Sequence, residues 1–297
     1  MSKIITLFFI MISISVSAQE TDDYKTRLRA IHNTPATYYN IDGVDFTSQT
    51  LTNSFTEKDL KSIYKKFGIS NEESKLKDDS LLFNNFHIIK RKKVTDSLTL
   101  ITTYYFVEDK QKKVTAFCFN YFENRNPAFE RKFIDLIIND QIPNSVFENE
   151  RIDSIDFAGR KIQLSRSCNW TNVNTVQCTY NGEMNWSIHL TLLSAKNAIK
   201  NQLSLTKSKN GLKVISEEEV DIIFENTPTK VLKVIFGFTG VTNLLVKTSG
   251  AKTLTAYYVA NKIRGNYISC VLSFWNNDNI NPSGLPPLLN KVMQLTK

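Results

Sequence analysis

Apolar and polar positions alternate along two similar segments of the chain, and an apolar pattern with helical spacing follows each of them. The first segment, residues 102–124, precedes the pattern PAFERKFIDLIIND at 127–140. The second, residues 255–277, precedes PPLLNKVMQL at 286–295 after a Pro/Gly turn. Alternation over this length is typical of strands, and the later spacing is typical of helices. The pattern predicts a strand-turn-strand-helix unit that occurs twice.

The two segments also match residue by residue. Superimposing the Tyr-Tyr pair at 104–105 on the pair at 257–258 without gaps aligns Asn124 with Asn277. In the second copy, polar Ser269 and Ser273 alternate with apolar residues, which predicts a sheet covered by helices on one face. Two related half-chains explain this match most simply.

The rest of the chain predicts further helices and strands in each half. Thr56 and Gly68 delimit a helix with one apolar face, and Asn126 caps the helix that follows the first repeated segment. Another helix is expected over 194–207. Further strands are expected over residues 81–90, 97–108, 114–122, 152–164, 184–193, 212–225, 230–240 and 242–249.

The predicted fold class is therefore α+β, with two tandem related domains that each pack helices on an antiparallel sheet. Residues 138–154 mix Pro, Asn and acidic residues, so we place the boundary near Glu150. The domains are residues 19–149 and 150–297.

The first eighteen residues have the pattern of a cleaved signal peptide. Lys3 precedes an apolar run at 4–14, and Val16-Ser17-Ala18 supplies small or neutral residues before the cut. The run is shorter than the roughly 20 residues that span a bilayer, and no later stretch is long and apolar enough. We expect export to the periplasm or outside the cell, with no integral membrane segment after cleavage.

The charge balance indicates no particular partner. The formal net charge is +8, with one dense cluster at 90–93, which a solvated turn explains. No nucleic-acid-binding module accompanies it, so no nucleic-acid partner is predicted.

The four cysteines lie after the predicted cut. Cys168 and Cys178 bracket a polar turn between two short strands, and export favours oxidation, so we predict a disulfide between them. Cys118 and Cys270 fall on opposite faces of their copies of the repeated segment. They are expected to be separate buried thiols.

The usual catalytic and metal-binding patterns are missing from the sequence. His32, His87 and His189 are far apart and belong to no metal motif, so neither a metal nor another cofactor is predicted. Glu217, Glu219 and Asp221 share one face of an expected strand, where charges discourage edge-to-edge aggregation. No catalytic residue is assigned.

The best candidate binding residues are the tryptophans and an asparagine in the second half. Trp170 lies between the paired cysteines, Trp186 in the next strand, and Trp275 before an Asn-rich loop that contains Asn277. Indole rings beside amides suit the stacking and hydrogen bonding of sugars. Core packing is the ordinary use of tryptophans in strands, and it remains the alternative.

The end of the chain resembles a known fold. The succession of YYV, a basic turn, ISCVLSF and PPLLNKVMQL resembles the last two strands and closing helix of PsbP-like α/β/α sandwich domains. That resemblance implies an α+β fold and no particular activity. The SAQ ending of the signal is similar to export signals of Bacteroidota, and the whole chain resembles secreted proteins of flavobacterial type.

These observations predict a non-catalytic exported protein that binds a protein partner or a cell-envelope ligand such as a glycan. One alternative is a secreted hydrolase of envelope glycans or peptides, which needs two acids in one cleft or a nucleophile beside His189. Another is a carrier of an apolar ligand, which needs a cavity between sheet and helix lined by Phe and Tyr.

Overall fold

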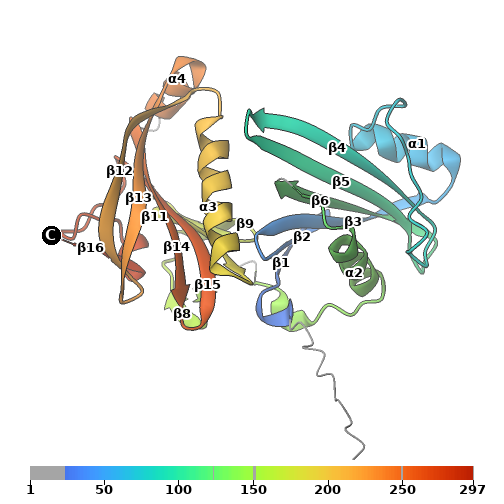
Figure 1. Cartoon of the computed structure of the whole chain (residues 1–297), viewed down its shortest axis with the longest axis horizontal. Coiled ribbons are helices and arrows are strands. Elements are labelled where there is room, and N and C mark those ends of the chain that lie inside the picture. The colour runs from blue at the N-terminus through green and yellow to red at the C-terminus, as the bar shows by residue number, and fades with distance from the viewer. Residues whose placement is uncertain (1–23, 123, 150–151, 249, 297) are drawn as a thin grey trace, which may run out of the picture.

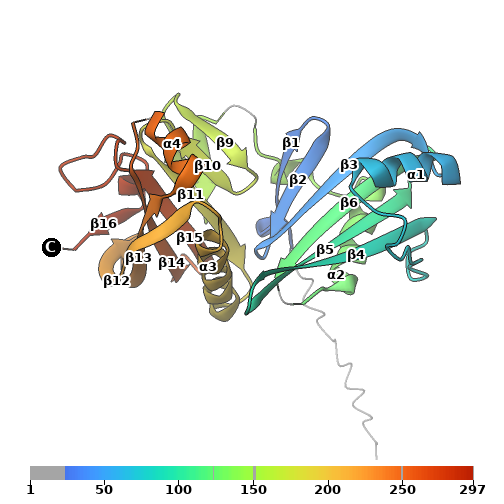
Figure 2. The same cartoon turned by 90° about the horizontal axis from the view of Figure 1, so that it is seen from above.

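The computed structural model describes residues 24–122, 124–149, 152–248 and 250–296. The predicted signal peptide and the predicted boundary at Glu150 lie outside these residues. The described chain is mainly antiparallel β-sheet with a few helices, an α+β arrangement, and it forms two large sheets side by side (Figures 1 and 2). No described helix is long and apolar enough to cross a membrane.

The first sheet has the strand order β1-β2-β3-β6-β5-β4, and every pairing is antiparallel. Its elements are β1 Arg29–Asn33, β2 Ala36–Ile41, β3 Val44–Ser54, α1 Glu57–Lys66, β4 Asn85–Thr95, β5 Leu98–Glu108, β6 Lys113–Phe122 and α2 Pro127–Ile138.

The helices of this half begin where side chains cap them, as the sequence predicts. Thr56 Oγ1 accepts the Asp59 N–H at 3.3 Å at the start of α1. The Asn126 side chain accepts the Phe129 N–H at 3.1 Å before Pro127 opens α2. Each contact satisfies an N–H group that the first helical turn leaves without a backbone partner.

Helices cover both faces of the first sheet. Leu60 of α1 packs with Phe106 and Val114, whereas Phe133 of α2 packs with Phe119 on the other face. Neighbouring strand residues point to opposite faces, so one strand contributes to both cores.

The second sheet has the order β16-β12-β13-β14-β15-β11-β10-β9, again antiparallel throughout. Its strands are β9 Cys168–Asn172, β10 Thr175–Cys178, β11 Gly182–His189, β12 Leu212–Phe224, β13 Thr227–Phe238, β14 Thr253–Ile263, β15 Asn266–Trp275 and β16 Met293–Leu295. The hairpin of β7 Ser154–Phe157 and β8 Arg160–Gln163 precedes it, and the helices are α3 Leu192–Lys207 and α4 Gly240–Thr248.

As the alternation predicts, one face of the second sheet is buried and the other, which carries α3, is partly exposed, since Glu217 and Glu219 of β12 are exposed there. Helix α3 lies on the side of this sheet that faces the first half (Figures 1 and 2). On that side Ser269 and Ser273 are only 6% and 9% exposed. The opposite face packs against Phe157 of the β7–β8 hairpin and against Leu289 of the C-terminal segment.

Two elements differ from the sequence-based expectation. Residues 242–249 were expected as a strand, but α4 occupies most of this stretch, and an apolar run this short fits either structure. The expected closing helix is instead the 3-10 turn Leu289–Lys291 followed by β16, which pairs with β12. Pairing of β16 with β12 draws the end of this short segment into the sheet, while its apolar residues, such as Leu289 and Val292, still reach the core.

The two sheets share one order of connections. In the first, the meander β1-β2-β3 leads through α1 to the meander β4-β5-β6, whose last strand pairs with β3. In the second, β9-β10-β11 leads through α3 to β12-β13-β14-β15, whose last strand pairs with β11. The second sheet therefore repeats the connectivity of the first with two strands added, one in the second meander and β16 at the edge beside β12.

The gapless superposition of the repeated segments does not preserve strand register. Tyr104 lies opposite Cys118, whereas Tyr257 lies opposite Leu272, one position beyond the residue that the superposition matches to Cys118. A shift of one residue exchanges the two faces of a strand. The superposition thus matches residues of β6 and β15 that lie on the same face of their sheets. It matches residues of β5 and β14 that lie on opposite faces, unless one strand is shifted by one residue.

The predicted disulfide is confirmed: Cys168 and Cys178 lie opposite each other on β9 and β10 and are bonded. Cys118 is partly buried, and Cys270 is buried at 1% exposure; both are free thiols. Burial raises the pKa of both thiols, which suppresses their thiolate forms.

Replacing both Cys168 and Cys178 by Ser is expected to lower the free energy of unfolding by about 2 kcal/mol, because the bond closes only a short loop. Urea unfolding of the oxidised and doubly substituted proteins measures the difference. Mass spectrometry of unreduced peptides provides the control, since a peptide with both thiols free would contradict the bonded hairpin.

Candidate functional site

Arg29 joins the two halves through the tryptophans of the second sheet. Its guanidinium carbon lies 4.1 Å from the ring centroid of Trp186 and 5.0 Å from that of Trp170. Its Nη2 donates to Glu148 Oε1 at 2.7 Å. Trp186 has 0% exposure, so its indole belongs to the core and has no open face for a ligand. Cation–π contact with two rings favours a fixed junction.

Trp170 lies at the edge of an open groove between the halves, which we call the Trp170 groove. The ring is partly buried, and its Nε1–H donates to the Asn149 carbonyl at 3.2 Å. The groove has a volume of about 500 Å³ and lies between the β1–β2 and β9–β10 hairpins. Its lining is Ile31, His32, Asn33, Thr34, Tyr38, Asn169, Trp170, Thr171, Asn172 and Val173.

Trp275 and Asn277 line a different depression, the Trp275 pocket. It has a volume of about 440 Å³ and lies where β11 begins and β15 ends, on the face of the sheet that carries α3. The lining is Gln177, Cys178, Thr179, Tyr180, Gly182, Glu183, Leu254, Ser273, Trp275, Asn277 and Asp278. The structure thus brings two of the four predicted site residues together and places Trp170 and Trp186 elsewhere.

The Trp275 pocket is held in shape by contacts around its rim. Phe238 stacks against Trp275, with ring centroids 5.4 Å apart and planes 24° from parallel. Asp278 Oδ2 accepts the Trp275 N–H at 2.9 Å, and the Asn279 N–H donates to the Tyr180 carbonyl at 2.8 Å. The loop after β15 is therefore tied both to the strand end and to the turn before β11. A fixed site loses little entropy when a ligand binds.

Two carboxyl groups in this pocket, those of Glu183 and Asp278, have raised pKa values because they are partly buried. Burial raises the pKa of Glu183, and Lys209 offsets part of that effect. Burial also raises the pKa of Asp278, against the lowering effect of the hydrogen bond from the Trp275 N–H. Both groups hold protons more readily than exposed carboxyl groups do. Such groups can donate and accept hydrogen bonds to ligand hydroxyls.

Sequence reasoning missed these two acids and Tyr180, which is 58% exposed. A signal for Glu183 exists, because it alternates with the buried Met184 and must point to the opposite face of β11. The sequence holds no signal that joins Glu183 to Asp278, because only the pairing of β11 with β15 brings them near one pocket.

His189 lies beside a hydroxyl group but has no catalytic setting. Its Nε2 is 2.8 Å from Ser269 Oγ, while Nδ1 has no hydrogen-bond partner of normal geometry. The ring is 3% exposed and packs against Gly43, where a β-carbon would lie 2.6 Å from Cε1. A triad needs a third group that orients the imidazole and an open path to the hydroxyl. His189 instead packs against Gly43 and is buried at the junction between the halves.

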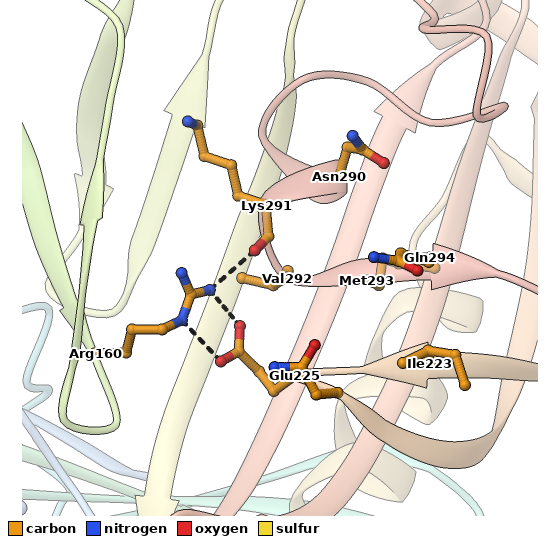
Figure 3. Close-up of a pocket in the computed structure, with 9 residues that line it drawn as sticks. Arg160, Ile223, Glu225, Asn290, Lys291, Val292, Met293 and Gln294 are labelled. Carbon is orange, nitrogen blue, oxygen red and sulfur yellow. Dashed lines mark hydrogen bonds and ion pairs between the residues drawn. The ribbon is translucent and has the colours of Figure 1, made fainter.

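A smaller cavity of about 200 Å³ lies where the C-terminal segment meets the β12–β13 turn (Figure 3). Glu225 occupies its wall and forms ion pairs with Arg160 and Arg264. Arg160 also donates to the Lys291 carbonyl at 2.9 Å. These contacts satisfy the Glu225 carboxylate and fasten the C-terminal segment, so the cluster stabilises the fold.

Among the described residues, no group of His, Cys, Asp or Glu is placed to hold a metal ion. No protein family model and no curated protein match the chain. A search of solved structures found weak similarity to the di-domain ARO/CYC StfQ from the steffimycin biosynthetic pathway. That match has 9% identity and a TM-score of 0.18, and it covers 89% of this chain and 77% of the other. A TM-score this low does not indicate a shared fold.

Proposed function

We propose that this chain is an exported, non-catalytic protein of two tandem related domains that binds a cell-envelope glycan in the Trp275 pocket. One observation carries the proposal: an indole, a phenol, an amide and two carboxyl groups line the same pre-shaped depression. Recognition sites typically combine apolar surface with a few placed polar groups.

The chemistry of the pocket suits a sugar. The C–H faces of a pyranose ring pack on flat aromatic surfaces, here those of Trp275 and Tyr180. Its hydroxyl groups both donate and accept hydrogen bonds, which the Asn277 amide and the Glu183 and Asp278 carboxyl groups can match. A disulfide immediately beside the pocket, at Cys178, limits its distortion.

Two observations support export and duplication. The pattern of residues 1–18 is that of an export signal, and the Cys168–Cys178 bond suits an oxidising compartment. The shared order of connections in the two sheets supports tandem related domains.

Calorimetric titration with peptidoglycan fragments and neutral oligosaccharides tests the proposal. We expect a specific ligand whose affinity falls at least about tenfold in Trp275→Ala, the loss typical of a central aromatic anchor. Trp170→Ala is the matched control, because that ring lies in the other groove and its loss should leave affinity unchanged. If no glycan binds, or if Trp275→Ala binds as tightly as the wild type, the pocket has another role. A protein partner, sought by crosslinking, then becomes the better hypothesis.

The two carboxyl groups favour a second candidate, a hydrolase of envelope glycans. A carboxyl group that keeps its proton can act as a general acid, and a second one near it can serve as base or nucleophile. Incubation of the wild type with envelope glycans should then release reducing ends, and Glu183→Gln and Asp278→Asn should each abolish that release. Binding without release by the wild type supports the non-catalytic function.

A further inference from the structure

A further groove lies in the other half of the chain, away from the Trp275 pocket. It has a volume of about 650 Å³ and lies beside α1, between the end of β3 and the start of β4. In Figure 1, α1 lies at the outer end of the first sheet, remote from α3. The lining of this α1 groove is Phe55, Glu57, Leu60, Lys61, Tyr64, Asn71, Lys75, Asn84 and Phe86.

The floor and walls of the α1 groove are apolar. The rings of Phe55 and Phe86 stack with centroids 5.7 Å apart and planes only 5° from parallel. Leu60 is buried beneath them, while Phe55, Tyr64 and Phe86 remain partly exposed to the groove. Three aromatic side chains that line one open depression leave apolar surface in contact with water. Covering such surface is favourable in proportion to its area.

The mouth of the α1 groove carries positive charge. Lys75 Nζ lies 5.5 Å from the Tyr64 ring centroid, and the carbonyl oxygens of Ser70, Asn71 and Glu73 hold it at 2.9, 3.2 and 2.7 Å. The Glu73 carboxylate beside it forms an ion pair with Lys90 at 3.1 Å. The carbonyl groups hold the Lys75 ammonium in place, and the Glu73 carboxylate, which interacts with both Lys75 and Lys90, offsets only one of these two positive charges. A bound anion would therefore meet a net positive charge at the groove mouth.

The residues around the mouth of the α1 groove also carry a net positive charge. Helix α1 carries four lysines against two acidic residues, and one of the lysines, Lys61, lines the groove. Lys61 is paired at 2.8 Å with Glu57 on the exposed side of the helix, which leaves Lys75 as the fixed cation. Apolar walls with a cation at one end are complementary to a molecule that has a hydrocarbon chain and an anionic head.

We propose that the α1 groove binds a single-chain anionic amphiphile such as a long-chain fatty acid, with the chain on Phe55 and Phe86 and the carboxylate at Lys75. The site is independent of the Trp275 pocket. The two sites can therefore be tested separately in one protein.

Calorimetric titration of the full chain with dodecanoate, below the concentration at which it forms micelles, tests the proposal. We expect one dodecanoate per chain. Phe55→Glu should weaken binding at least about tenfold, because it places a carboxylate against the hydrocarbon chain. The matched control is Leu82→Glu, which makes a similar change at a side chain 95% exposed and outside the groove. It should bind as the wild type does.

A second variant tests the head group without disturbing the apolar walls. Lys75→Gln should weaken dodecanoate binding about fivefold, the effect of one partly exposed ion pair, and leave dodecanol binding unchanged. Equal dodecanoate affinity in wild type and Phe55→Glu, or no binding by the wild type, would overturn the proposal. Sedimentation of the protein with phosphatidylglycerol vesicles in the absence of dodecanoate binding would also overturn it, because the basic face would then be a membrane contact. Trp275→Ala should bind dodecanoate normally, which separates this result from the glycan proposal.

Discussion

Replacing Arg125 by Met is expected to lower the free energy of unfolding by about 3 to 5 kcal/mol, because it leaves a buried carboxylate without its cation. The carboxylate is that of Glu130 in α2, whose side chain has 0% exposure. Arg125 Nε donates to both of its oxygens, at 3.1 and 2.8 Å. Arg125 Nη2 also donates to Tyr105 Oη at 2.7 Å. Urea unfolding followed by circular dichroism measures the loss, because all three tryptophans lie in the other half of the chain.

The neighbouring arginine of α2 supplies the control. Arg131 Nη1 lies 3.3 Å from Asp78 Oδ2, but its side chain is 33% exposed and remains accessible to water. Arg131→Met should therefore cost only about 1 kcal/mol or less. A cost this small in Arg125→Met would contradict the interpretation that Glu130 is a buried carboxylate neutralised by Arg125.

A double substitution separates the cost of an unpaired charge from the loss of packing. If Glu130 is also replaced, by Leu, the buried charge disappears together with its partner, and hydrophobic residues of similar size often replace such pairs without loss. The Arg125→Met, Glu130→Leu protein should therefore be more stable than Arg125→Met alone. Tyr105 is the group that limits the recovery, since its hydroxyl also donates to Asp78 at 3.0 Å and must keep that contact.

The sequence predicted which helices and strands form better than it predicted which residues contact each other in space. The caps at Thr56 and Asn126 and the disulfide between Cys168 and Cys178 depend on residues close in sequence, and all are present. Glu130 shows the opposite case. Its carboxylate is buried against the Tyr105 hydroxyl of β5, 25 positions earlier in the chain, and nothing in the α2 pattern indicates that contact.

The candidate site was only half predictable for a similar reason. Trp275 and Asn277 are two residues apart, so a local pattern could join them. Glu183 enters the same pocket only because β11, far earlier in the chain, pairs with β15. Trp186 was misleading because it lies on the face of β11 that is buried against the β7–β8 hairpin, and period-two alternation does not tell which face a ligand could reach. The register slip between β5 and β14 has the same origin, since turn geometry, and not residue similarity, sets which residues pair.

Acid should weaken this fold through His189 at the junction of the halves. Burial lowers the pKa of His189 to about 4, and the backbone of Asp42 offsets only part of the effect. In the unfolded chain an imidazole titrates near its ordinary pKa of about 6.5. Between these values the unfolded chain binds the proton more readily. The stabilising contribution is therefore complete above about pH 6.5 and is lost as the pH falls toward 4, by about 3 kcal/mol in all.

Urea unfolding at pH 7 and at pH 4 isolates this contribution when wild type and His189→Gln are compared. Glutamine can still hydrogen-bond to Ser269 but takes up no proton, so the variant should lose about 3 kcal/mol less than the wild type on acidification. Asn172→Gln, a change at an exposed side chain that takes up no proton, should retain the wild-type pH dependence. The difference between proteins is the useful quantity, because burial also lowers the pKa of His87 and raises that of Glu183 in both. Equal acid sensitivity in wild type and His189→Gln would mean that water reaches His189, and that Gly43 does not seal the contact between the two sheets.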